Sequence, residues 1–194
     1  MSIFELYLKL GFEHIADLAG YDHILFIITL CAIYKLNQWR KVIILVTAFT
    51  IGHSVTLALA TLKIINITTG LIEFLIPVTI FLTALGNILQ NKEEVSKQLH
   101  YFKYATAMFF GLIHGLGFSN YLKSLLGLEN SILGPLFSFN IGIEIGQLII
   151  VMIIFAISYS LTDILKVKKR ELNLVISGAG LGISLILLIE RWPS

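Results

Sequence analysis

The sequence predicts an all-α integral membrane protein: a six-transmembrane-helix bundle with a short amphipathic N-terminal helix and both termini on the extracytoplasmic side. Of the 194 residues, 57% are hydrophobic and only 13% are charged, whereas about 25% are charged in an ordinary soluble domain. The apolar residues gather in six long runs, and lysine and arginine gather in alternate connections between them. Runs of this length must be helices in lipid, because every backbone polar group has to be satisfied internally.

The first 20 residues predict an amphipathic helix that lies on the outer membrane face. Its apolar residues are Ile3, Phe4, Leu6, Tyr7, Leu10 and Phe12. The segment also carries Glu5, Glu13 and Asp17 and has no small-residue cleavage site, which argues against an ordinary signal peptide. We therefore expect a helix that is retained at the membrane surface.

Six apolar runs follow this segment, and a bilayer core about 30 Å thick needs roughly 20 residues per helical span. The expected spans lie near residues 21–36, 42–62, 71–89, 102–126, 133–161 and 172–189. They leave no stretch for a second domain. Residues 1–194 are therefore expected to form one transmembrane domain.

The cationic residues give an independent test of this count. Ten of the 14 fall in or beside alternate connections: Lys35, Arg40, Lys41, Lys92, Lys97, Lys103, Lys166, Lys168, Lys169 and Arg170. The others are Lys9, Lys63, Lys123 and Arg191. The richer side is cytoplasmic by the positive-inside rule, so both termini are expected to face outward. An even number of spans also requires both termini on the same side. The net charge of +2 therefore reflects topology, and no nucleic-acid partner is expected.

Ionisable residues inside the expected spans are the candidates for function, because each costs about 2.5 to 3.5 kcal/mol at membrane depth. Counting inward at about 1.5 Å per residue places three of them near the midplane: His53, His114 and Glu144. Three others lie nearer the outer surface: Asp22, His23 and Glu73. His14 lies just outside the membrane, where it is a candidate ligand at the entrance. Together these residues predict a polar track from the outer face to the centre of the membrane.

The stretch GLIHGLGF, residues 111–118, surrounds His114 with glycines. Small residues let a neighbouring helix approach closely, so we expect a second backbone, and with it a second ligand, beside His114. Imidazole together with carboxylate suits divalent transition metals, and the single cysteine, Cys31, disfavours a thiolate site. The residues by themselves predict a metal or proton site and do not select the metal.

Each candidate also has a plain structural explanation. A membrane histidine such as His53 can simply hydrogen-bond a carbonyl group on the next helix. Asp22 can cap the helix that it begins, and Glu73 can occupy a favourable position in the first turn of its helix. For His114 with Glu144 we favour function, because a carboxylate at the same membrane depth is harder to explain structurally.

Four motifs follow one another along nearly the whole chain. They are HIADLAGYDHILF (residues 14–26), FTIGHSVTLALA (49–60), GLIHGLGFS (111–119) and FNIGIEIGQ (139–147). Together they resemble the HupE/UreJ family of hydrogenase and urease accessory membrane proteins, which implies a permease for nickel or cobalt in the bacterial inner membrane. By position, the resemblance implicates His14, Asp22, His23, His53, His114 and Glu144. The seven residues between His14 and Asp22 make a longer gap than the family pattern has, and the family's cleaved signal peptide is not apparent.

Two classes of function stay open at this stage. In a transporter, a hydrated divalent cation meets the outer residues of the track, sheds water and passes to the midplane residues before its release inward. In a zinc-dependent intramembrane hydrolase, His23, His53 and His114 hold zinc, a carboxylate activates the bound water and Ser54 helps to bind an oxyanion.

The sequence offers arguments against both classes. It lacks the HExxH and GxSxG motifs of known hydrolases, but no polar series leads from the midplane to the cytoplasm, as a transporter needs. A metal sensor or a metalloenzyme-maturation partner is a third option, and a homo-oligomer is compatible with all three. The bound metal is nickel, cobalt or zinc in each case.

Overall fold

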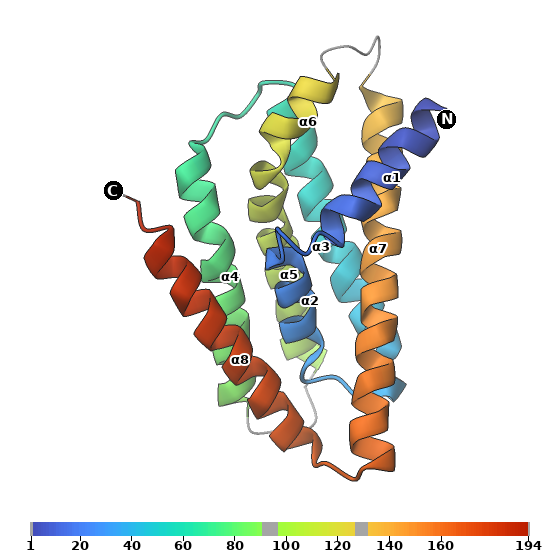
Figure 1. Ribbon diagram of the computed structural model, residues 1–194, viewed down its shortest axis with the longest axis vertical. Helices are drawn as coiled ribbons and strands as arrows, with labels where there is room; N and C mark the ends of the chain where they lie inside the picture. The colour runs from blue at the N-terminus through green and yellow to red at the C-terminus, as the bar shows by residue number, and fades with distance from the viewer. Residues whose placement is uncertain (1, 91–96, 127–131, 194) are drawn as a thin grey trace.

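The computed structural model describes residues 2–90, 97–126 and 132–193, which form helices and connecting turns and contain no strand (Figure 1). The helices are α1 (Ile3–Ile15), α2 (Asp22–Cys31), η1 (Leu36–Gln38), α3 (Trp39–Thr61), α4 (Thr69–Leu89), α5 (Lys97–Gly117), α6 (Ser119–Leu126), α7 (Leu133–Tyr159), η2 (Ser160–Ile164) and α8 (Lys169–Glu190). The predicted all-α class is confirmed.

Four helical segments of the described residues are long and apolar enough to cross a membrane. They are Leu36–Thr61, Thr69–Leu89, Leu133–Ile164 and Lys169–Glu190. By contrast, α2 has 10 residues and is about 15 Å long, half the thickness of the apolar bilayer core. α5 has 21 residues, but its first two turns are rich in charged and polar residues. The structure therefore supports a membrane protein with four spanning helices, and the count of six stays a prediction.

Two of the expected spans are interrupted. Within residues 21–36 the chain is α-helical only in α2, and a non-helical segment, residues 16–21, separates α2 from α1. The expected span 102–126 is divided at Phe118 into α5 and α6. Gly115 and Gly117 precede this break, and glycine is a poor helix former. Both interruptions lie beside the histidines described below.

α1 packs against α7 (Figure 1), and its expected place on the outer membrane face stays a prediction. Glycines bring the two backbones together: a side chain at Gly11 would collide with the carbonyl oxygen of Phe139, and one at Gly142 with that of Leu8. The buried face of α1 consists of Tyr7, Gly11 and Ile15. α1 is therefore part of the bundle, and its last turn has a fixed position.

The glycines around His114 pack against α3, as the sequence predicts. A side chain at Gly111 would collide with the carbonyl oxygen of Phe49, and one at Gly115 with the carbonyl oxygen of His53. Such close approach of two backbones requires residues without a Cβ atom. The contact brings the turn of α5 that carries His114 against the turn of α3 that carries His53.

Amide, hydroxyl and guanidinium groups join α2, α4 and α8 in what we call the asparagine network: Thr29, Asn87, Asn173, Ser177 and Arg170. Asn87 Nδ2 donates to the carbonyl oxygen of Thr29 over 2.7 Å, and Asn173 Nδ2 donates to the carbonyl oxygen of Asn87 over 3.0 Å. Ser177 Oγ donates to Asn173 Oδ1, and Arg170 donates to three carbonyl groups at the end of α4. Because the last carbonyl groups of a helix have no partner within it, the network caps α2 and α4.

The two ends of the bundle differ in charge. α2 ends and α3 begins at the lower end of Figure 1, where α7 also ends and α8 begins, and both chain termini lie in the upper half. The described basic residues at the lower end include Lys35, Arg40, Lys41, Lys166, Lys168, Lys169 and Arg170, and Lys92 lies outside the described residues. We call this the basic end, and by the positive-inside rule we expect it to face the cytoplasm.

Candidate metal site

Four of the five histidines of the chain meet inside the bundle. They come from four helices: His14 from the last turn of α1, His23 from the first turn of α2, His53 from α3 and His114 from the last turn of α5. The ring centroids of His14 and His23 are 4.6 Å apart, those of His23 and His114 5.0 Å, and those of His14 and His53 5.8 Å. We call these four residues the histidine cluster.

Three of these imidazoles are close enough to share one ion. His14, His23 and His53 each offer a ring nitrogen, and the three nitrogens lie within 4.8 Å of one another. With metal–nitrogen bonds of about 2.1 Å, two ligand atoms on one ion are at most about 4.2 Å apart. A small closure of the rings therefore suffices. Among the residues that the structure describes, no carboxylate belongs to this group of ligand atoms.

Five ring nitrogens of the cluster are buried and have no hydrogen-bond partner within the described part of the chain. They are His14 Nε2, His23 Nε2, both nitrogens of His53 and His114 Nδ1. His53 and His114 are fully buried, and His23 is 7% exposed. Each unpaired buried polar group costs about 1 to 3 kcal/mol, so five of them in one place are expensive unless a ligand binds them. The unpaired nitrogens therefore make the cluster a candidate binding site.

The hydroxyl group of Thr79 on α4 sets the chemistry of His114. Thr79 Oγ1 donates its hydrogen to the carbonyl oxygen of Ile76 over 2.7 Å and lies 3.0 Å from His114 Nε2. While the hydroxyl hydrogen is donated to Ile76, the oxygen can only accept from His114 Nε2, because a hydroxyl group has one hydrogen. His114 Nδ1 then carries the free lone pair in the neutral ring, which is the form that ligates a metal.

A cavity of about 450 Å³ connects the cluster with the surface at the end opposite the basic end. We call it the vestibule; its lining includes three histidines of the cluster and the charged residues Asp17, Asp22, Glu73 and Arg191. Asp17 and Glu73 are exposed to solvent, whereas His23 and His114 are buried. The interruptions of the helical backbone at residues 16–21 and at Phe118 also border this cavity. Asp22, His23, Glu73 and His114 of the predicted polar track line this cavity, whereas His53 and Glu144 are not among its lining residues.

Asp22 and Arg191 form an ion pair in the vestibule. Arg191 Nη1 donates to Asp22 Oδ2 over 3.0 Å, and Asp22 Oδ1 is buried without a partner. The same Nη1 lies 3.5 Å from the carbonyl oxygen of Glu73, which lacks its helical donor because Pro77, four residues on, has no N–H. The Glu73 carboxylate remains exposed. Asp22 therefore has one oxygen engaged by a cation and one available.

Glu144 lies apart from the group of histidine nitrogens. Its carboxylate accepts hydrogen bonds from Thr47 Oγ1 over 2.6 Å and from Thr50 Oγ1 over 2.5 Å, and Gln147 also contacts Thr50. Thr50 and Thr47 precede His53 by one and about two helical turns. The carboxylate is thus displaced from the cluster toward the basic end.

The sequence analysis did not select four residues that shape this site. Asp17 lines the vestibule, Thr79 orients His114, Arg191 holds Asp22, and Thr47 binds Glu144. A threonine in an apolar helix and a basic residue near the end of the chain carry no local signal of function. Only Asp17 had such a signal, because it lies within the first of the four motifs.

The fold and the site together define an all-α membrane protein with a candidate metal centre. The family model described as HupE / UreJ protein matches residues 1–191, and the chain belongs to this family. No curated protein and no solved structure matches the chain.

Proposed function

We propose that this protein transports nickel or cobalt ions across the bacterial inner membrane. The observation that carries the proposal is the histidine cluster, with five buried, unpaired ring nitrogens from four helices at the inner end of an acid-lined vestibule. Neutral imidazole is a good ligand for divalent ions of this kind. Membership of the HupE / UreJ family points to the same class of metal.

The vestibule supports the capture step. Its exposed carboxylates, Asp17 and Glu73, attract a hydrated dication, since a cleft lined by one sign of charge concentrates its counter-ion. The free oxygen of Asp22 comes next, directly before His23 in the chain. Imidazole nitrogens then replace water molecules around the ion.

Glu144 supports a step beyond the cluster. Its carboxylate and the neighbouring hydroxyl groups of Thr47 and Thr50 offer oxygen ligands, which bind nickel and cobalt less tightly than imidazole does. A permeating ion needs such a weaker site to move to, because conduction requires release as well as binding. This group lies toward the basic end, on the side where the sequence alone indicated no polar series.

The interrupted helices favour transport as well. Transporters commonly bind their substrate where transmembrane helices are discontinuous, because non-helical backbone at that depth is tolerated beside a cavity. Here the breaks at residues 16–21 and at Phe118 border two of the segments that we expect as spans and lie next to the vestibule. We expect the chain at these two breaks to move when the ion passes.

The zinc hydrolase finds less support. No carboxylate of the described residues joins the group of histidine nitrogens, and the nearest described candidate for a base, Asp22, is paired with Arg191 through one oxygen. Ser54 Oγ donates to the backbone carbonyl of Thr50 over 2.6 Å, an ordinary bond within a helix. The serine therefore has no special position for an oxyanion.

Uptake into proteoliposomes tests the proposal. Liposomes that contain the protein and a metal-quenched fluorophore should lose fluorescence when Ni²⁺ or Co²⁺ is added outside. His114→Ala should abolish this loss. His100→Ala is the matched control, because His100 lies on the same helix and outside the cluster, and it should transport normally. Tight binding of nickel without uptake would contradict transport and favour a sensor or a maturation partner.

A further inference from the structure

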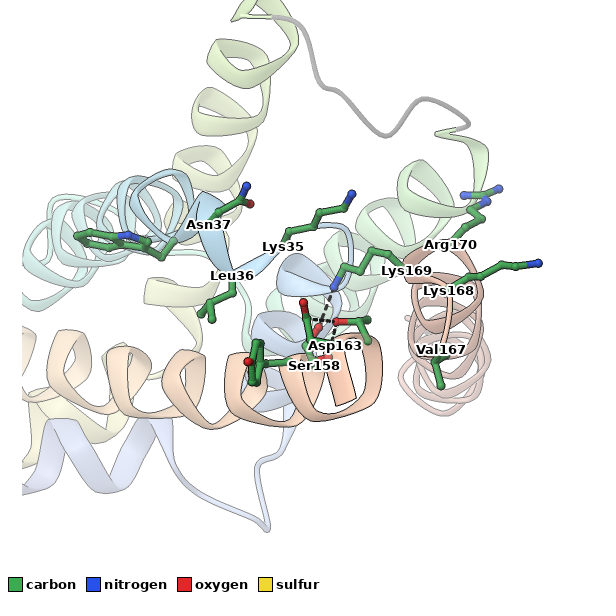
Figure 2. Close-up of a pocket in the computed structure, with 12 residues that line it drawn as sticks. Lys35, Leu36, Asn37, Ser158, Asp163, Val167, Lys168, Lys169 and Arg170 are labelled. Atoms are coloured by element: carbon green, nitrogen blue, oxygen red, sulfur yellow. Dashed lines mark hydrogen bonds between the residues drawn. The ribbon is translucent and has the colours of Figure 1, made fainter. Parts of the chain in front are cut away.

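The basic end of the bundle holds a second, unrelated cavity of about 780 Å³ (Figure 2). It lies between the start of η1, the end of α7 with η2, and the start of α8. Its lining carries four cationic side chains and one carboxylate: Lys35, Lys168, Lys169, Arg170 and Asp163. We call it the basic pocket; its excess of positive charge suits an anion.

Two of the cations have structural partners that hold them at the wall of the pocket. Lys169 Nζ donates to Ser158 Oγ over 3.0 Å, as Figure 2 shows, and Arg170 caps the end of α4. Lys168 is 81% exposed and only 3.5 Å from Glu171, a surface pair of a kind worth about 1 kcal/mol or less. Lys169 and Arg170 are thus held at the wall of the pocket, and the lining carries more cationic than acidic side chains.

An apolar groove of about 520 Å³ continues from the basic pocket between α3 and α7. The two cavities share Leu36, Trp39 and Tyr159. Along α7 the groove reaches from Tyr159 to Leu148, which is about 16 Å at 1.5 Å per residue. This length is close to half of an apolar bilayer core about 30 Å thick, which is the depth that one acyl chain covers.

The shared aromatic residues lie where a membrane surface is expected. Trp39 and Tyr159 are 47% and 45% exposed, and both residue types favour the boundary between headgroups and hydrocarbon. On one side of them the cavity is cationic, and on the other side it is apolar. This is the arrangement of an amphipathic molecule with an anionic head.

We propose that the basic pocket and the apolar groove together bind one anionic phospholipid from the leaflet at the basic end. The phosphate group lies among the lysines, and an acyl chain lies in the groove between α3 and α7. Basic pockets between transmembrane helices are suited to anionic headgroups. A free phosphate ion would leave the groove unused, and a zwitterionic lipid would gain little from the charge. This proposal does not depend on metal transport.

Native mass spectrometry of the detergent-purified protein, with phosphatidylglycerol or phosphatidylcholine added, tests the proposal. We expect one phosphatidylglycerol to bind at least fivefold more tightly than phosphatidylcholine. The double substitution Lys35→Gln/Lys168→Gln should remove this preference, since it leaves the hydrogen bonds of Lys169 and Arg170 in place. Lys63→Gln, at the opposite end, is the control and should keep it.

A second substitution tests the acyl chain. Ala156 is exposed in the groove, and Ala156→Phe should fill the groove and weaken phosphatidylglycerol binding at least fivefold. Ala179→Phe places the same ring on an exposed position of α8 and should leave binding unchanged. Equal binding of the two lipids would overturn the proposal. Equally tight binding of glycerol phosphate, unaffected by Ala156→Phe, would also overturn it and show a site for small anions.

Discussion

The histidine cluster and the asparagine network are both polar groups inside an apolar bundle, and α2 connects them. His23 lies in the first turn of this helix, and Thr29 lies near its end. In the network, each amide nitrogen that we describe has a carbonyl acceptor, at 2.7 Å for Asn87 and at 3.0 Å for Asn173. In the cluster, five ring nitrogens have no partner among the described residues.

We interpret this difference as one between helix packing and a candidate ligand site. A buried polar group that is fully hydrogen-bonded stabilises one arrangement of helices, whereas a group left unpaired costs free energy until a ligand completes it. The network joins the far end of α2 to α4 and α8, away from His23. We therefore expect substitutions in the cluster to change metal binding, and substitutions in the network to change stability.

The largest effect is expected at the cluster. His23→Ala should weaken nickel binding by more than about 100-fold, because even the outer partners of metal ligands contribute 10- to 100-fold. Titration calorimetry in detergent measures the affinity, and thermal unfolding checks that the variant is folded. His100→Ala removes a histidine outside the cluster and should bind nickel normally. Unchanged affinity in His23→Ala would exclude this residue from the site.

A substitution in the asparagine network should instead lower the stability of the protein. Asn173→Leu keeps the size of the side chain but removes its bonds to the Asn87 carbonyl oxygen and to Ser177, which should lower the free energy of unfolding by about 1 to 3 kcal/mol. Denaturant titration measures this loss. Val175→Ala, on the exposed face of α8, should change stability little. If Asn173→Leu also weakened nickel binding strongly, the two polar groups would not be independent.

The sequence could predict which residues are unusual but not which of them meet. Histidines and glycines stand out in apolar helices, and the depth of each histidine follows from its distance along a span, so a similar depth for His53 and His114 was predictable. His14 joins them because the chain turns between α1 and α2, which no periodicity shows. Glu144 has a similar depth, yet its helix face directs it to Thr47 and Thr50.

Small residues illustrate the same limit. The stretch SGAGLG, residues 177–182, predicts a packing face on α8, and Gly178 and Gly182 are as small as Gly180. Only Gly180 lies against another helix, close to Thr29, while no described atom lies within 4 Å of a Cβ placed at Gly178 or Gly182. Which face of a helix is buried depends on its neighbours, and those are tertiary contacts.

A smaller effect is expected from Thr79, which contacts His114 of the histidine cluster through its hydroxyl group. Thr79→Val keeps the shape of the side chain and removes the oxygen that lies 3.0 Å from His114 Nε2. His114 then loses the partner that fixes its tautomer, and nickel should bind about tenfold more weakly, as for other outer partners of metal ligands. Thr83→Val, one turn further along α4, loses only a bond to the Thr79 carbonyl oxygen and should not change the affinity.

The smallest effect is expected from Arg191, because its described bonds go to Asp22 and to the Glu73 carbonyl oxygen and not to a ring nitrogen of the cluster. Arg191→Gln removes a cation from Asp22 and the vestibule, so nickel should bind several-fold more tightly at low salt, with less gain at high salt. Lys9→Gln removes a cation from the same half of the molecule but outside the vestibule, and should have no effect. Weaker binding in Arg191→Gln would mean that the guanidinium group holds Asp22 in the orientation that the ion needs. Arg191 would then act as Thr79 does, by orienting a residue of the site, and would not compete with the metal ion for the Asp22 carboxylate.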